Sequence, residues 1–200
     1  MWYLYSPLFA SLLLFQTAAL AAASVGESAP TFTLTDTHGE THSLGDFRGK
    51  VVVLEWTNHE CPFVQKHYGA DNMQTLQRTY TDQDVIWLSI ISSAPGEQGY
   101  VEPAEANSLT ASRKASPTAV LMDPTGDVGR AYGAKTTPHM YIIDGDGTLV
   151  YMGGIDSIRS TRMADIEKAT PYVKVSLNEV LAAEPVSNPV TRPYGCTIKY

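Results

Sequence analysis

Two cysteines are the residues of this chain best suited to nucleophilic and redox chemistry. Cys61 follows a continuous apolar run, Val51–Leu54, and precedes Pro62, a residue type favoured at the first position of a helix. The Cys61 thiol is therefore predicted at a helix start, where free backbone N–H groups and the helix dipole stabilise a thiolate. Cys196 is the only other cysteine, so the two form either a structural disulfide or a redox pair.

The surroundings of Cys61 resemble the strand–Cys-x-x-Cys–helix motif of the thioredoxin fold. The motif reads CPFV over Cys61–Val64, so valine stands in place of the second cysteine. Glu55 lies six residues before Cys61, at the spacing of a buried acidic residue that takes part in proton transfer in thioredoxins. Pro138 stands just before the apolar run His139–Ile143, where thioredoxins carry a cis-proline packed against the active-site cysteine. The resemblance therefore implies a redox site that includes Cys61, Glu55 and Pro138.

This resemblance extends over residues 29–155 and is greatest to the peroxiredoxin-like redoxins of the alkyl hydroperoxide reductase/thiol-specific antioxidant (AhpC/TSA) family. It implies an α/β, thioredoxin-like fold with a mixed central sheet flanked by helices, an N-terminal hairpin, one insertion at 93–117 and a C-terminal tail. It also implies a cis peptide bond before Pro138. Glu55 is expected to be buried, which would raise its pKa because the charged carboxylate is desolvated.

Hydrophobic periodicity and turn signals predict the elements that hold these residues in place. Apolar or alternating runs predict strands at 31–34, 41–43, 51–56, 84–92, 118–122, 139–143 and 148–152. Helical spacing predicts helices at 62–80, 102–115 and 173–183, with a short helix ending at Tyr132 and a kink at Gly69. Strands 51–56 and 84–92 are predicted to be parallel, so their carboxyl ends would carry the site.

The first residues of the chain have the composition of a signal peptide. Leu8–Leu20 is an apolar core and Ala21–Ala23 supplies small residues for cleavage, although no Lys or Arg precedes the core. The predicted organisation is a signal peptide at 1–23, a redoxin domain at 24–184 and a tail at 185–200 that docks on the domain. The mature protein is therefore expected to be exported, to the periplasm or outside the cell.

The charge of the chain limits its partners. A formal net charge of −7 argues against nucleic acid or an anionic membrane surface as the main partner. Contact with a membrane is expected only through the targeting segment. No cofactor or metal is expected, and the expected partner is a protein thiol or disulfide that serves as substrate or reductant.

Three functions are open at this point, and the thioredoxin-like motif favours the first. In a thiol–disulfide oxidoreductase or antioxidant redoxin, Cys61 attacks as a thiolate and Cys196 resolves the intermediate. A peroxiredoxin-like peroxidase is the second, but Asn58 stands three residues before Cys61, where peroxiredoxins have Thr or Ser. The third is a non-catalytic module that binds a metal or a partner, and its candidate metal ligands are His59, Cys61, His67 and His139.

The tail has a pattern typical of a segment that docks. In Thr191–Tyr200, turn residues precede Cys196, and the residues after it alternate, with Ile198 and Tyr200 on one face. Docking near the start of the Cys61 helix would let Cys196 replace the cysteine that is missing at Val64. Pairing of Cys196 with another protein, or its burial as a free thiol, are the alternatives.

Overall fold

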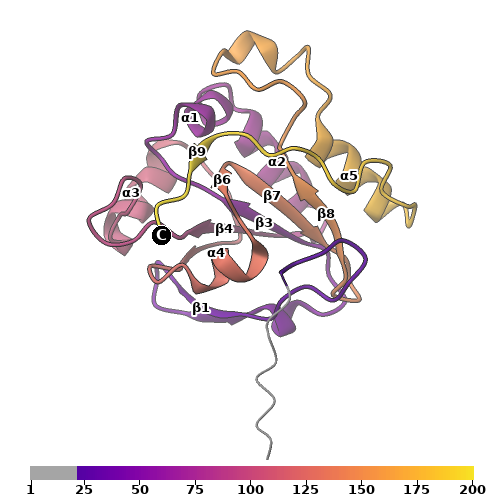
Figure 1. Ribbon diagram of the computed structural model, residues 1–200, viewed down its shortest axis with the longest axis horizontal. Helices are drawn as coiled ribbons and strands as arrows, with labels where there is room; N and C mark the ends of the chain where they lie inside the picture. Colours follow the sequence, from indigo (N-terminus) through magenta and orange to yellow (C-terminus); the bar gives the residue numbers. More distant parts are fainter. Residues whose placement is uncertain (1–21) are drawn as a thin grey trace, which may run out of the picture.

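The computed structural model describes residues 22–200, so the predicted signal peptide at 1–23 lies outside the described residues except for its last two. A mixed sheet of seven strands forms the centre of the fold, in the order β2-β1-β5-β4-β3-β7-β8 (Figure 1). These strands are β1 (Thr33–Asp36), β2 (Thr41–Ser43), β3 (Val52–Trp56), β4 (Ile86–Ile91), β5 (Ala119–Met122), β7 (His139–Ile143) and β8 (Leu149–Gly153). Strands β3, β4 and β5 are parallel to one another, and the remaining pairs are antiparallel.

Helices cover both faces of this sheet (Figure 1). They are η1 (Leu44–Phe47), α1 (Pro62–Gly69), α2 (Asn72–Thr81), α3 (Pro103–Ser112), α4 (Asp127–Tyr132), η2 (Met163–Asp165) and α5 (Tyr172–Leu181). Among the described residues, none of these helices is long and apolar enough to cross a membrane. The α/β, thioredoxin-like fold class predicted from the sequence is confirmed.

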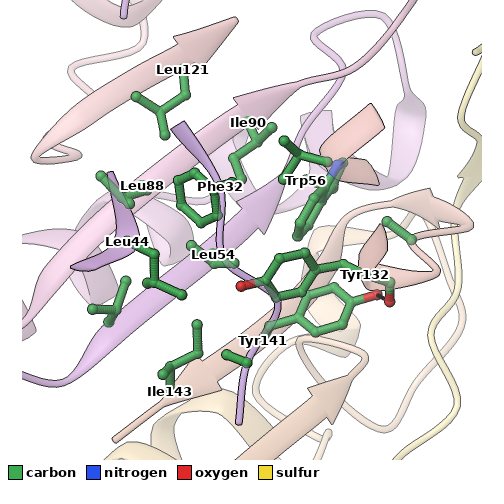
Figure 2. Packing of buried hydrophobic residues seen from close by; sticks show 14 of the residues in the cluster. Phe32, Leu44, Leu54, Trp56, Leu88, Ile90, Leu121, Tyr132, Tyr141 and Ile143 are labelled. Atoms are coloured by element: carbon green, nitrogen blue, oxygen red, sulfur yellow. Dashed lines mark hydrogen bonds between the residues drawn. The ribbon is translucent and has the colours of Figure 1, made fainter. Parts of the chain in front are cut away.

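Alternating side chains of the central strands enter two large hydrophobic clusters, one on each face of the sheet, and Ile91 and Val120 enter a smaller third one. The cluster beside α4 contains aromatic rings in tilted or edge-to-face contact, those of Trp56, Tyr132 and Tyr141 (Figure 2). The opposite cluster packs β3 and β7 against α1, α2 and α5, and it includes Cys61. The parallel pair β3 and β4 is therefore buried on both faces, which explains why its strands read as continuous apolar runs.

The single helix predicted over 62–80 is wrong, because the structure contains two helices there. Helix α1 ends at Gly69, and Asp71 adopts a left-handed backbone conformation with φ 55°. At the break the backbone carbonyl of Tyr68 accepts from the Asp71 N–H at 3.3 Å and from the side-chain amide of Gln74 at 2.8 Å. The first strand also begins two residues later than predicted, at Thr33.

The tail crosses the molecule from α5 toward α3 and carries a short strand, β9 (Cys196–Thr197), which pairs with β6 (Thr136–Thr137) (Figure 1). Before β9, the tail pairs with β8, where the Thr191 N–H donates to the Met152 carbonyl at 3.1 Å. After β9, the Ile198 N–H donates to the Lys135 carbonyl at 3.1 Å. The tail is thus held by backbone hydrogen bonds on both sides of Cys196.

Candidate active site

Cys61 occupies the N-terminal capping position of α1, at the carboxyl end of β3. Pro62 follows in the first turn, and the Cys61 N–H donates to the Asn58 carbonyl at 3.1 Å, which closes the connecting loop. The Cys61 thiol donates to the backbone carbonyl of Thr137 at 3.0 Å. The Cys61 side chain is fully buried, with 0% exposure. No outside molecule can reach this sulfur until something that covers it moves.

Pro138 follows the carbonyl that Cys61 contacts. The peptide bond between Thr137 and Pro138 is cis. Thr137 is the last residue of β6, whose only paired strand among the described residues is β9. The backbone beside Cys61 is therefore occupied by the tail of the chain itself.

Cys196 lies opposite Thr137 in the antiparallel β6–β9 pair. Its backbone N–H donates to the Cys61 sulfur at 3.4 Å, and both cysteines are free thiols. Gly195, with φ +145°, lies so close to the backbone of Thr137 that a Cβ atom there would collide with the Thr137 carbonyl. Glycine at this position is what lets the tail bring Cys196 against Cys61.

The two thiols affect one another. Burial raises the pKa of Cys196 to about 12, and the hydrogen bond and charge of Cys61 contribute to the rise. Docked Cys196 is therefore protonated at neutral pH and is a poor nucleophile while Cys61 is a free thiol beside it. A dithiol of this kind can form a disulfide, and its two cysteines are predicted to act in sequence rather than together.

Glu55 lies on β3 with 0% exposure and accepts hydrogen bonds from four side chains. The donors are Tyr68 Oη at 2.8 Å, Trp87 Nε1 at 2.8 Å, Ser89 Oγ at 3.1 Å and Gln77 Nε2 at 3.2 Å. Burial raises the pKa of the Glu55 carboxyl, although the bonds from Trp87 and Tyr68 oppose the shift. None of the hydrogen bonds of Glu55 within the described residues goes to a cysteine. Its link to the site runs through Tyr68, which belongs to the same helix that begins at Cys61.

Sequence reasoning missed a buried polar cluster that joins the tail to α1. Lys66 Nζ and the carboxylate of Asp156 lie 3.2 Å apart, and both residues are buried. Tyr194 Oη donates to the other oxygen of Asp156 at 2.5 Å, and the ring of His67 lies 3.1 Å from the same hydroxyl. Lysine is seldom fully buried, so the residue type of Lys66 argues for an exposed position. The one signal for its burial is its place in the helix between Val64 and His67, which are both buried.

The metal-binding alternative finds no support in the histidines that it named. In residues 22–200, the one group of three or more potential ligands is Asp36, Glu40 and His42, which lies in the β1–β2 hairpin away from both cysteines. His67 uses both ring nitrogens in hydrogen bonds, to Tyr194 and Asn72. The arrangement of the candidate site is that of a dithiol centre.

Comparisons with known proteins agree with the geometry. The chain matches the AhpC/TSA family over residues 25–152. It is 30% identical over 126 residues to the thiol-disulfide oxidoreductase ResA of Geobacillus thermodenitrificans (strain NG80-2), and the match covers 63% of this chain and 67% of ResA.

Solved structures are similar over more of the chain. An uncharacterized conserved protein from Geobacillus kaustophilus has a TM-score of 0.77 and 26% identity, and the match covers 88% of this chain and 92% of that one. A putative thiol:disulfide interchange protein DsbE from Chlorobium tepidum has a TM-score of 0.58 and 22% identity, with 81% and 98% of the two chains covered. The second likeness, at this identity, concerns the fold alone.

Proposed function

This chain belongs to the AhpC/TSA family, and from that premise we propose that it is an exported thiol–disulfide oxidoreductase with Cys61 as nucleophile and Cys196 as resolving cysteine. The observation that carries the proposal is the position of Cys196, whose backbone N–H donates to the Cys61 sulfur at 3.4 Å. The relatives that are named thiol-disulfide oxidoreductases support the oxidoreductase activity. The tail supplies in space the second cysteine that the CPFV motif lacks.

The reaction is a two-step exchange that balances without a cofactor. The Cys61 thiolate attacks one sulfur of a substrate disulfide, forms a mixed disulfide and releases the other substrate sulfur as a thiolate. The Cys196 thiolate then attacks the Cys61 sulfur, forms the Cys61–Cys196 disulfide and releases the second substrate thiolate. The substrate gains two electrons and the protein dithiol loses them. A reducing dithiol protein regenerates the enzyme, and the same steps in reverse oxidise a substrate dithiol.

The interaction between the two thiols suits this order of events. In the mixed disulfide the Cys61 sulfur carries no charge and is a much weaker acceptor for the Cys196 S–H, so two of the contributions that raise the pKa of Cys196 are reduced. Cys196 then becomes easier to deprotonate at the moment when it must attack. The resolving step is therefore triggered by completion of the first step.

Three further groups support the exchange. The Thr137 carbonyl, which precedes Pro138, accepts from the Cys61 thiol at 3.0 Å and so orients the sulfur. Glu55 is a buried carboxyl with a raised pKa beside the Cys61 helix, and in this proposal it takes up and returns protons during the cycle. Tyr68 connects Glu55 to that helix.

Export is the part of the proposal that depends on the sequence before the described residues. The apolar segment at 1–23 and the two cysteines fit an oxidising compartment, in the periplasm or outside the cell. Cell fractionation of the full chain, followed by mass spectrometry of its N-terminus, tests this part. Recovery of the protein in the cytoplasm with Met1 retained would contradict export.

The enzymatic part is tested by comparing the protein with its Cys61→Ser and Cys196→Ser variants in a protein-disulfide reduction assay. Cys61→Ser is expected to abolish exchange, and Cys196→Ser is expected to accumulate a mixed disulfide on Cys61 that is visible by non-reducing electrophoresis. Mass spectrometry of the oxidised wild type is expected to find one Cys61–Cys196 disulfide. Two alkylatable cysteines after oxidation, or full activity of Cys196→Ser, would overturn the role of Cys196.

Hydrogen peroxide separates this function from that of a peroxidase. Asn58 takes the place of the Thr or Ser of peroxiredoxins, and its side-chain oxygen accepts from the Glu60 N–H at 2.9 Å. Oxidation of Cys61 by peroxide is therefore expected to be no faster than that of a free thiol. A fast and saturable reaction with peroxide would favour the peroxidase instead.

A further inference from the structure

The buried polar cluster between α1 and the tail has no part in the exchange described above. Lys66 and His67 belong to α1, Asp156 follows β8, and Tyr194 lies in the tail two residues before Cys196. Each of these residues is at most 5% exposed. Charged groups are costly to bury unless they are paired and fully hydrogen-bonded. Breaking one interaction of this cluster is therefore expected to destabilise the folded protein.

The hydrogen bonds of the cluster form one directed chain that ends on the carboxylate. The Asn72 amide donates to His67 Nδ1 at 2.9 Å, which leaves the proton of the neutral ring on Nε2. That N–H donates to Tyr194 Oη at 3.1 Å, and the tyrosine hydroxyl donates to Asp156 at 2.5 Å. Lys66 neutralises Asp156 from the other side, at 3.2 Å. Burial lowers the pKa of His67 to about 4, so the ring is neutral at pH 7.

Tyr194 is the one member that comes from the tail, and its position decides where the tail lies. The next residue, Gly195, lies in close contact with the Thr137 backbone, and Cys196 follows directly over Cys61. The ring of Phe63, in the first turn of α1, packs on the ring of Tyr194 with centroids 5.7 Å apart. Release of Tyr194 would free the tail at the residues that cover the Cys61 sulfur.

We propose that Tyr194 is a positioning residue that latches the tail over Cys61, an inference that rests on the proposed function. The latch has opposite effects on the two steps of the exchange. A closed tail keeps external disulfides away from Cys61 and so slows formation of the mixed disulfide. It also holds Cys196 beside the Cys61 sulfur and so speeds resolution, because an oriented thiol acts as if at high local concentration.

The first test measures how often the tail opens. In a Cys196→Ser background, Cys61 reacts with iodoacetamide only when the tail is open, so the alkylation rate is proportional to the open fraction. Tyr194→Phe deletes two hydrogen bonds of the closed form and is expected to raise this rate about tenfold. Tyr80→Phe is the matched control, because its hydroxyl also lies within hydrogen-bond distance of two acceptors, Asn178 Oδ1 at 2.8 Å and the Lys174 carbonyl at 3.0 Å, but joins α2 to α5. It is expected to leave the rate unchanged.

The second test measures resolution in the protein with both cysteines. The reduced protein is mixed with 5,5′-dithiobis(2-nitrobenzoate), an aromatic disulfide that forms a mixed disulfide on Cys61 and releases one thionitrobenzoate. Attack by Cys196 forms the Cys61–Cys196 bond and releases the second thionitrobenzoate, with the proton of Cys196 passing to solvent. Tyr194→Phe is expected to speed the first release and to slow the second about tenfold. Cys61→Ser calibrates any direct reaction at Cys196.

A gentler variant keeps the inference testable if Tyr194→Phe fails to fold. Asn72→Ala removes the donor that fixes the His67 tautomer from a half-buried position, and it is expected to raise the alkylation rate about two- to threefold. In the Cys196→Ser background, alkylation rates that stay unchanged when Tyr194→Phe or Asn72→Ala is added would overturn the latch. Absence of a second thionitrobenzoate release in the wild type would instead overturn the proposed role of Cys196, and the alkylation result would stand separately.

Discussion

Oxidation is expected to stabilise this protein by an amount that its topology sets. A Cys61–Cys196 disulfide closes a loop of 135 residues in the unfolded chain. In the chain-entropy model a loop of that length destabilises the unfolded state by about 5 kcal/mol at 25 °C. The native state has little to lose in return, because β9 already pairs with β6 and Cys196 already lies against Cys61 in the reduced form. The free energy of unfolding is therefore expected to rise by about 4–5 kcal/mol on oxidation.

Urea unfolding of the oxidised and reduced protein, followed by circular dichroism, measures this difference. With a slope of about 2 kcal/mol per molar urea, the midpoint of the oxidised form is expected about 2 M above that of the reduced form. Cys196→Ser is the control, since its midpoint must not respond to the oxidant. Coincident midpoints for the oxidised and reduced wild type would refute the reasoning, because they would mean that the tail is not linked to Cys61.

Three substitutions test other parts of the structure. Glu55→Gln is expected to gain stability relative to the wild type as pH rises from 4.5, because the folded wild type holds the Glu55 proton more tightly than the unfolded chain. Urea unfolding over about pH 4 to 8 measures this, and parallel pH profiles of the unfolding free energy would contradict it. Gly195→Ala places a Cβ against the Thr137 carbonyl and is expected to raise the rate of Cys61 alkylation at least about tenfold. Gly39→Ala is the control, because Gly39 also has a positive φ but has open space around it, and this variant should leave the rate unchanged. Lys66→Ala leaves a buried carboxylate without its cation, and a loss of about 3–5 kcal/mol in unfolding free energy is expected; a loss below about 1 kcal/mol would mean that the pair is not buried in solution.

The centre of the fold could be predicted because its signals are local. The apolar run of β3, the proline after Cys61 and the strand after Pro138 each identify an element from adjacent residues. The relation of Glu55 to Cys61 could also be predicted, because Glu55 lies on β3 and Cys61 lies at the end of the loop that leaves β3. Predictions of this kind need no knowledge of which distant segments meet.

The parts that the sequence did not predict depend on long-range contacts or on single backbone angles. Lys66 meets Asp156 across 90 residues, and no local pattern marks an aliphatic ammonium for burial. The break between α1 and α2 rests on the positive φ of Asp71, a residue that adopts this conformation much less often than glycine. The metal-binding hypothesis selected histidines by residue type alone. In the structure their hydrogen-bond partners come from distant elements, as Tyr194 does for His67, and no local pattern predicts such pairs.

The place of Cys196 in the chain also imposes an order in time. Cys61 is made 135 residues before Cys196, and at about 5–20 residues per second this interval lasts roughly 7–27 s. All strands of the central sheet precede β9, so the sheet can assemble while the Cys61 sulfur is still uncovered. A nascent chain thus passes through a stage with one accessible thiol, in which capture by a foreign cysteine competes with folding. Arrival of β9 ends that stage, and the same strand that completes the dithiol also protects it.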